Sequence, residues 1–144
     1  MTREAVVAEA ETWLGTPYHS GARIKGVGVD CAMILAAVFE AAGVIPHVDP
    51  GTYAADFGLH RDEEVFLGWV ERYGYPVEKP QAGDVALFVY GRCFSHGAIM
   101  TSATGLIHAV RRDGMVSRGD LADTGLAERE VRFFTLWPEV TDGR

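Results

Sequence analysis

The sequence lacks the surplus of basic side chains that nucleic-acid-binding proteins carry. It contains 13 Lys and Arg residues against 20 Asp and Glu residues, and its formal net charge is −7. This acidic balance argues against nucleic acid as a partner and against electrostatic adhesion to anionic membranes or wall polymers. If the substrate is a polyanion, something other than charge must bring the protein to it.

Cysteine is also scarce, because Cys31 and Cys93 are the two cysteines of the whole chain. Neither belongs to a C-x-x-C pair, so the sequence has no disulfide framework and no paired-cysteine metal site. A single disulfide between Cys31 and Cys93 is an alternative reading. The rarity of disulfides in cytosolic proteins disfavours it.

Long apolar runs are missing too. The longest run, Cys31 to Phe39, is far shorter than the ~18 residues that a membrane-spanning helix requires. The N-terminus, Met1 to Ala5, has neither the basic start nor the apolar block of a secretory signal. We therefore expect synthesis in the cytoplasm without a signal peptide, and no membrane as a partner. To act outside the cell, the protein would need another assembly to carry it.

The composition is that of an ordinary globular protein, with 48% hydrophobic and 23% charged residues over a length of 144. This length predicts a single domain, residues 1–144, with a hydrophobic core of its own. Apolar residues at helical spacing, followed by Gly or Pro, predict three helices in the first half of the chain. They are expected over residues 2–14, 31–42 and 61–73.

The character of the sequence changes after Pro80. Short strand-like segments alternate there with turn-like dipeptides such as Thr104-Gly105 and Asp113-Gly114. Helices followed by an antiparallel meander predict an α+β fold, with a C-terminal sheet over 84–137 and a short tail at 138–144. The five expected strands are Val85–Tyr90, Ser95–Thr101, Leu106–Val110, Met115–Arg118 and Val131–Trp137.

Cys31 has the most distinctive chemical setting. It follows Asp30 and a glycine-rich loop, and it opens the apolar helix predicted over 31–42. Two distant histidines, His96 and His108, lie in strand-like segments, which is an arrangement suited to a cysteine nucleophile. Free N–H groups at a helix start and a nearby imidazolium both favour a thiolate. We therefore expect the pKa of Cys31 to lie below the ~8.5 of a free thiol.

The imidazoles meet the thiol only if the strands are arranged suitably. Side chains alternate along a strand, so His96 shares a face with Ala98, and His108 shares a face with Leu106. If the two strands are neighbours and both of these faces turn toward the 31–42 helix, the rings can reach Cys31.

Five short motifs, in this order, resemble those of the NlpC-type peptidases, papain-like cysteine enzymes that cut the peptide stems of the bacterial cell wall. The longer stretch from Gly15 to Cys31 is most similar to the versions carried by tailed phages and phage-like gene transfer particles. The resemblance implies a papain-like fold, no cofactor and no metal. Its expected partners are the peptidoglycan stem peptide and phage tail proteins. The motifs are Gly15-Thr16-Pro17-Tyr18, Asp30-Cys31, Gly83-Asp84-Val85-Ala86-Leu87-Phe88, Ser95-His96-Gly97-Ala98-Ile99 and Ile107-His108-Ala109.

The resemblance also implies a role for each site residue. Cys31 is the nucleophile, His96 the general acid and base, and His108 the residue that orients the His96 ring. Tyr18 stabilises the oxyanion or positions the substrate. Asp30 contacts the free amine of an N-terminal L-alanine, although helix capping alone explains its presence. The implied reaction is hydrolysis of the amide between D-glutamate, through its γ-carboxyl, and the diamino acid, after delivery to the wall in a phage-like particle.

One departure from the family pattern lies directly after the nucleophile. Ala32-Met33 stands where a small residue and Gly, commonly Ser-Gly, are usual. This departure favours an alternative, a structural tail-tip component with little or no turnover. A second alternative function is that of an amidase or acyltransferase that forms a thioester with a different acyl substrate. A zinc site made of Cys31, His96 and His108 is disfavoured, because the sequence has no close ligand pair.

Overall fold

The computed structural model describes residues 2–46, 65–91 and 93–137. These residues form three helices and a six-stranded antiparallel sheet, so the expected α+β class is confirmed. The helices are α1 (Arg3–Glu11), α2 (Cys31–Ala41) and α4 (Val65–Tyr73). The strands, in their order across the sheet, are β3 (Tyr75–Val77), β8 (Val131–Thr135), β4 (Val85–Tyr90), β5 (Cys93–Met100), β6 (Gly105–Val110) and β7 (Met115–Asp120).

The helices begin and end where local signals act. Thr2 caps α1 by accepting a hydrogen bond from the Ala5 N–H at 3.0 Å, but α1 ends at Glu11, and residues 12–15 form a turn. After α2, Gly43 adopts a φ of 78°, which glycine tolerates at no steric cost. Of the helix expected over 61–73, α4 covers 65–73. Residues 61–64, like the tail 138–144, lie outside the described ranges. No described helix is long and apolar enough to cross a bilayer.

The sheet contains one strand more than the five expected. The additional strand, β3, pairs with β8 at the edge of the sheet. Proline has no backbone N–H to donate to a neighbouring strand, so Pro76 is tolerated in an edge strand. The segment 15–30 was expected to be irregular, yet it contains a two-residue hairpin formed by β1 (Arg23–Ile24) and β2 (Gly28–Val29). Pro17 forms an isolated bridge to Met115 of β7, which fixes this segment beside the sheet.

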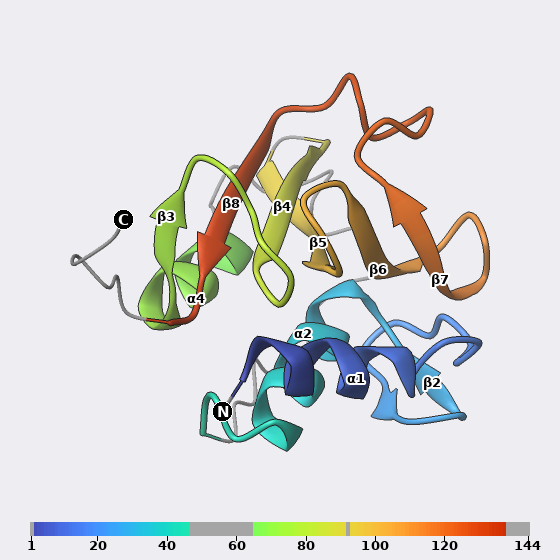
Figure 1. Cartoon of the computed structure of the whole chain (residues 1–144). Coiled ribbons are helices and arrows are strands. Elements are labelled where there is room, and N and C mark those ends of the chain that lie inside the picture. The colour runs from blue at the N-terminus through green and yellow to red at the C-terminus, as the bar shows by residue number, and fades with distance from the viewer. Residues whose placement is uncertain (1, 47–64, 92, 138–144) are drawn as a thin grey trace.

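The two faces of the sheet have different partners (Figure 1). The helices α1 and α2 lie together against one face, where residues such as Phe39 pack with Leu87 and Ile107 in the main core. On the other face a smaller cluster, which includes Phe88 and Leu106, packs with Leu126 from the connection between β7 and β8. Both faces of the sheet therefore contain buried side chains.

His96 and His108 lie on the face opposite to the helices. The His96 ring packs near the Phe88 ring, and Leu106, two residues before His108, belongs to the smaller cluster. The helix-facing residues of β6 are instead Ile107 and Ala109, which alternate with His108. The condition under which the rings were expected to reach Cys31, that both histidine-bearing faces turn toward α2, is therefore not met.

Candidate active site

Cys31 is the first residue of α2, held in place by a capped helix start. The Asp30 side chain caps the helix, and its Oδ1 accepts hydrogen bonds from the N–H groups of Ala32 at 3.1 Å and Met33 at 2.9 Å. The second carboxylate oxygen, Oδ2, accepts from the Gly21 N–H at 2.6 Å. Asp30 therefore ties the helix start to the preceding loop, and the N-cap expected from sequence is present.

A β-bulge presents backbone atoms to the thiol. The pairing of β4 with β5 shifts its register after Phe88, which leaves Ser95 as an extra residue just before His96. The Ser95 hydroxyl donates to the carbonyl of Tyr90 at 3.0 Å. Its own carbonyl oxygen accepts the Cys31 thiol at a sulfur–oxygen distance of 3.3 Å. The bulge thus ties the nucleophile candidate to the strand that bears His96.

The contact between Cys31 and β5 lies where β5 and β6 are not paired with each other. These strands are paired at Ile99–Ile107 and Met100–Leu106 and are not paired with each other at Ser95 to Gly97. The start of α2 lies at this unpaired part of β5, where the Gly97 N–H interacts with the Cys31 sulfur. Cys31 therefore contacts the backbone of β5 where this strand is not paired with β6, and it lines the same pocket as the two histidines.

The two imidazoles form a buried pair. Nε2 of His96 lies 2.9 Å from Nδ1 of His108, and the side chains are only 6% and 5% exposed. The rings meet edge to face, and the Tyr90 ring packs against the opposite side of His96 at a centroid distance of 4.8 Å. Because Nε2 of His96 is engaged, Nδ1 is the nitrogen left to exchange a proton with a thiol or a substrate.

Both imidazoles are neutral at physiological pH. Burial lowers the pKa of His96 to about 3, and the adjacent His108 lowers it further. Burial likewise lowers the pKa of His108 to about 4, although the carboxylates of Asp113 and Asp123 oppose this shift. The negative field of these carboxylates favours the His108 tautomer that carries its proton on Nε2. That tautomer leaves Nδ1 of His108 as the acceptor for His96.

The thiol is also neutral, in contrast to the expectation from sequence. Burial raises the pKa of Cys31 to about 12, and the Asp30 carboxylate raises it further. The N–H groups of Gly97 and Cys31 and the Tyr18 hydroxyl lower the pKa by smaller amounts. The helix start is occupied by the Asp30 carboxylate, so its positive end does not stabilise a thiolate as a bare terminus would.

Within the described residues, no hydrogen bond joins the Cys31 sulfur to either imidazole. Tyr18 contacts Cys31 from the other side, and burial together with the nearby Cys31 and Asp30 raises the pKa of its phenol. Tyr18 therefore stays protonated and is a hydrogen-bond donor beside the sulfur. The resting site pairs a neutral thiol with a neutral base and a phenolic donor.

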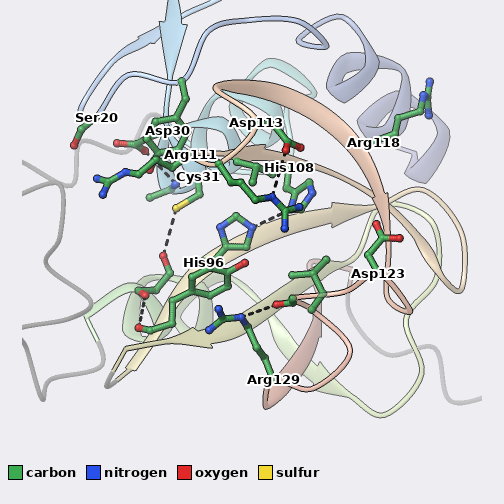
Figure 2. A pocket seen from close by; sticks show the side chains of 18 of the residues that line it. Ser20, Asp30, Cys31, His96, His108, Arg111, Asp113, Arg118, Asp123 and Arg129 are labelled. Atoms are coloured by element: carbon green, nitrogen blue, oxygen red, sulfur yellow. Dashed lines mark hydrogen bonds and ion pairs between the residues drawn. The ribbon is translucent and has the colours of Figure 1, made fainter.

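These side chains line one pocket of about 380 Å³, a size typical of small-ligand sites (Figure 2). All five residues expected at the site from sequence lie in its wall: Tyr18, Asp30, Cys31, His96 and His108. Cys31 is a free thiol. No group of three or more His, Cys, Asp or Glu side chains among the described residues is arranged to hold a metal ion.

Sequence reasoning missed the basic part of this pocket. Arg111 and Arg112 follow β6, the strand that bears His108. Their closeness to His108 in the sequence was a weak indication that they line the same site. Arg118 lies in β7, and Arg129 lies in the connection between β7 and β8. No sequence pattern predicted that Arg129 lies in the site. The residues that were missed include Tyr90, Ser95, Arg111, Arg112, Arg118 and Arg129.

No protein-family model matches the sequence, and no curated protein matches it either. Solved structures do match. The NlpC/p60 domain of the peptidoglycan hydrolase SagA superposes with a TM-score of 0.66 at 22% identity, covering 94% of this chain and 98% of that domain. The peptidoglycan hydrolase RipB from Mycobacterium tuberculosis gives 0.65 at 18% identity, covering 95% of this chain and 65% of RipB.

NlpC1 from Trichomonas vaginalis matches with a TM-score of 0.69 at 16% identity. This match covers 92% of the present chain and 43% of NlpC1, so the chain spans less than half of that protein. The identities of these three proteins are low, and what they share with the chain is the fold. The chain therefore has the papain-like fold of NlpC/p60 domains, in agreement with the fold that its motifs implied.

Proposed function

We propose that the chain is a cysteine hydrolase that cleaves an amide bond in the peptide stems of bacterial peptidoglycan. The observation that carries the proposal is the buried His96–His108 pair, 2.9 Å apart, in the same pocket as a free thiol at a helix start. The fold shared with peptidoglycan hydrolases supports the substrate class.

The proposed reaction begins with proton transfer from the Cys31 thiol to Nδ1 of His96 as the sulfur attacks the amide carbonyl carbon. The thiol must first leave the Ser95 carbonyl, which holds it at rest. His96 then returns the proton to the departing amine, the C–N bond breaks, and a thioester remains on Cys31. Water next gives one proton to His96 while its oxygen attacks the thioester carbon. The C–S bond then breaks, and the proton returns to the sulfur.

His108 acts in this scheme as a positioning residue. By accepting from Nε2 of His96 it fixes the tautomer in which Nδ1 has the lone pair that a base requires. Tyr18 and the Cys31 N–H, which both interact with the sulfur, are the donors that we assign to the developing oxyanion. Asp30 lines the pocket, and we assign it to the free amine of the substrate, because each carboxylate oxygen has two lone pairs.

Within this function we propose the bond between the γ-carboxyl of D-glutamate and the diamino acid. We also propose delivery by a phage-like tail particle, with tail proteins as partners. The choice of bond rests on the resemblance of the five motifs to the family, and the delivery rests on the resemblance of the Gly15-to-Cys31 segment to phage-borne members. A particle would solve the problem of approach, since a chain with a formal net charge of −7 is not attracted to anionic wall polymers.

The test is digestion of purified cell wall by the wild-type protein and by Cys31→Ala, with released muropeptides identified by mass spectrometry. We expect new N-termini on the diamino acid with the wild type and none with the variant. Equal release by both proteins, or release by neither, would falsify the hydrolase. An acyl group found on Cys31 that passes to an added amine rather than to water would instead identify a transferase.

A second candidate function is a structural tail component with little turnover. The observation that favours it is the resting thiol, which has a pKa raised to about 12 and donates to Ser95 rather than to His96. Under this reading the wall digest shows no products, while the protein still binds wall fragments and co-purifies with tail particles.

A further inference from the structure

The wall of the pocket has a small excess of positive charge in an acidic protein, because four arginines outnumber the three aspartates there: Asp30, Asp113 and Asp123. The chain has a formal net charge of −7, yet four arginines line the site: Arg111, Arg112, Arg118 and Arg129. Nothing in the proton transfers proposed above uses a guanidinium. Two of the four, Arg112 and Arg129, lie close to the residues that handle the departing amine.

Arg129 lies in the pocket wall, where its exposed side chain makes several contacts. Its Nε donates to the carbonyl of Gly125 at 2.6 Å and its Nη1 to the carbonyl of Val89 at 2.9 Å. The guanidinium stacks on Tyr90, with its central carbon 3.6 Å from the ring centroid, and Tyr90 in turn packs on His96. A guanidinium has five N–H groups, so these contacts leave donors for a ligand in a fixed orientation.

Arg112 lies near the same part of the pocket and comes from another element. It follows β6, and its Nη1 lies 3.6 Å from where a side chain on Gly125 would begin. Its positive charge lowers the pKa of both Tyr90 and His108, and the three residues line the same pocket. Its ion pair with the neighbouring Asp113, at 3.5 Å between two exposed side chains, is weak. Arg112 and Arg129 therefore converge near Gly125 from different elements.

We infer that Arg112 and Arg129 form a carboxylate-binding subsite for the residue whose amine departs from the substrate. The inference rests on the proposed function. The departing amine must take its proton from His96, so its residue lies on the side of His96, Tyr90 and Arg129. Paired guanidiniums match the planar fork of a carboxylate. The subsite selects a diamino acid with a side-chain carboxylate, as in diaminopimelate, over one without it, as in lysine.

The experiment compares two synthetic stems of L-alanine, γ-linked D-glutamate and diaminopimelate. One has a free distal carboxyl group, and in the other that group is amidated, so the pair differs by one charge at nearly equal shape. We expect the wild type to show a kcat/KM at least about tenfold higher for the free carboxylate. Arg112→Gln and Arg129→Gln should each remove most of that preference, mainly by lowering kcat/KM for the free carboxylate.

Arg118→Gln is the matched control. Arg118 also lines the pocket, but its Nη2 donates to Glu11 at 2.9 Å, and the preference should survive its loss. Equal kcat/KM for the two stems in the wild type would overturn the subsite while leaving the hydrolase intact. So would an equal loss on both stems in Arg112→Gln and Arg129→Gln.

If the wild type cleaves neither stem, the proposed function fails and the subsite is judged by binding alone. Calorimetry with the Cys31→Ala protein then compares the two stems, without and with Arg129→Gln. Tighter binding of the free carboxylate that disappears with Arg129→Gln supports the subsite. Equal binding of both stems overturns it.

Discussion

Acidification to about pH 5 should destabilise the folded protein through the buried imidazoles. The pKa is about 3 for His96 and about 4 for His108 in the folded chain, while an unfolded histidine titrates near 6.5. Below pH 6.5 the unfolded state therefore binds more protons than the folded state. Stability falls as the pH is lowered from about 6.5 to the folded pKa, which is about 4 for His108 and about 3 for His96.

The size of the effect follows from the same values. One pKa unit corresponds to about 1.4 kcal/mol, so at pH 5 each ring costs about 2 kcal/mol relative to pH 8. Two rings together cost about 4 kcal/mol, which is a large part of the 5–15 kcal/mol stability of a typical domain. Because both side chains are almost fully buried, solvent screening does not reduce this figure much.

Urea unfolding at pH 8 and pH 5, followed by tryptophan fluorescence to which the buried Trp13 contributes, measures the loss. A His96→Gln/His108→Gln protein cannot titrate at these positions, so its acid-induced loss should be smaller than that of the wild type by about 4 kcal/mol. His19→Gln is the control, because His19 is exposed. Equal losses in the wild type and the double variant would show that the rings are charged or hydrated in the folded state, and would refute the neutral pair.

Three further outcomes are expected. At pH 7, Cys31 should react with iodoacetamide about a thousandfold more slowly than a free thiol, because its pKa is about 12. The rate should rise about tenfold per pH unit. A flat rate from pH 6 to 8 would instead indicate a thiolate–imidazolium ion pair. Gly119→Ala would place a Cβ 3.0 Å from Nε2 of His108 and displace this ring. The displacement should lower the rate of wall hydrolysis about tenfold or more. An unchanged rate would contradict the positioning role of His108. Asp84 is 1% exposed and forms an ion pair with Arg3 at 2.6 Å. Asp84→Ala should therefore lower the free energy of unfolding, measured by urea titration, by about 3 kcal/mol. A loss below about 1 kcal/mol would mean that water replaces the ion pair.

Periodicity predicted most of the fold because most elements are long enough to show a pattern. The strand Val85–Tyr90 has the expected bounds, and α2 ends one residue earlier than expected. The edge strand β3 was missed because three residues, one of them Pro76, are too few for an alternation to appear. The hairpin of β1 and β2, with two residues in each strand, was missed for the same reason.

The side of the sheet on which the site lies could not be predicted from alternation. A period of two places His96 with Ala98 and His108 with Leu106, but it does not say which face the helices cover. That choice depends on the apolar side chains of β4 and β6 that pack against α2, and both faces of these strands are apolar. The bulge at Ser95 and the gap between β5 and β6 are tertiary features, and the sequence carried no sign of them.

The charge state of the thiol was mispredicted because two effects at a helix start oppose each other. A bare terminus stabilises an anion, but an aspartate cap satisfies the same N–H groups and adds a negative charge beside the sulfur. Cys31 is therefore a protonated thiol that donates a hydrogen bond to the Ser95 carbonyl. Its proton can pass to His96 only when the thiol turns toward that ring. Under the proposed function deprotonation would therefore accompany attack, and the buried, neutral His96 would suit that task better than an imidazolium, which has no lone pair to accept the proton.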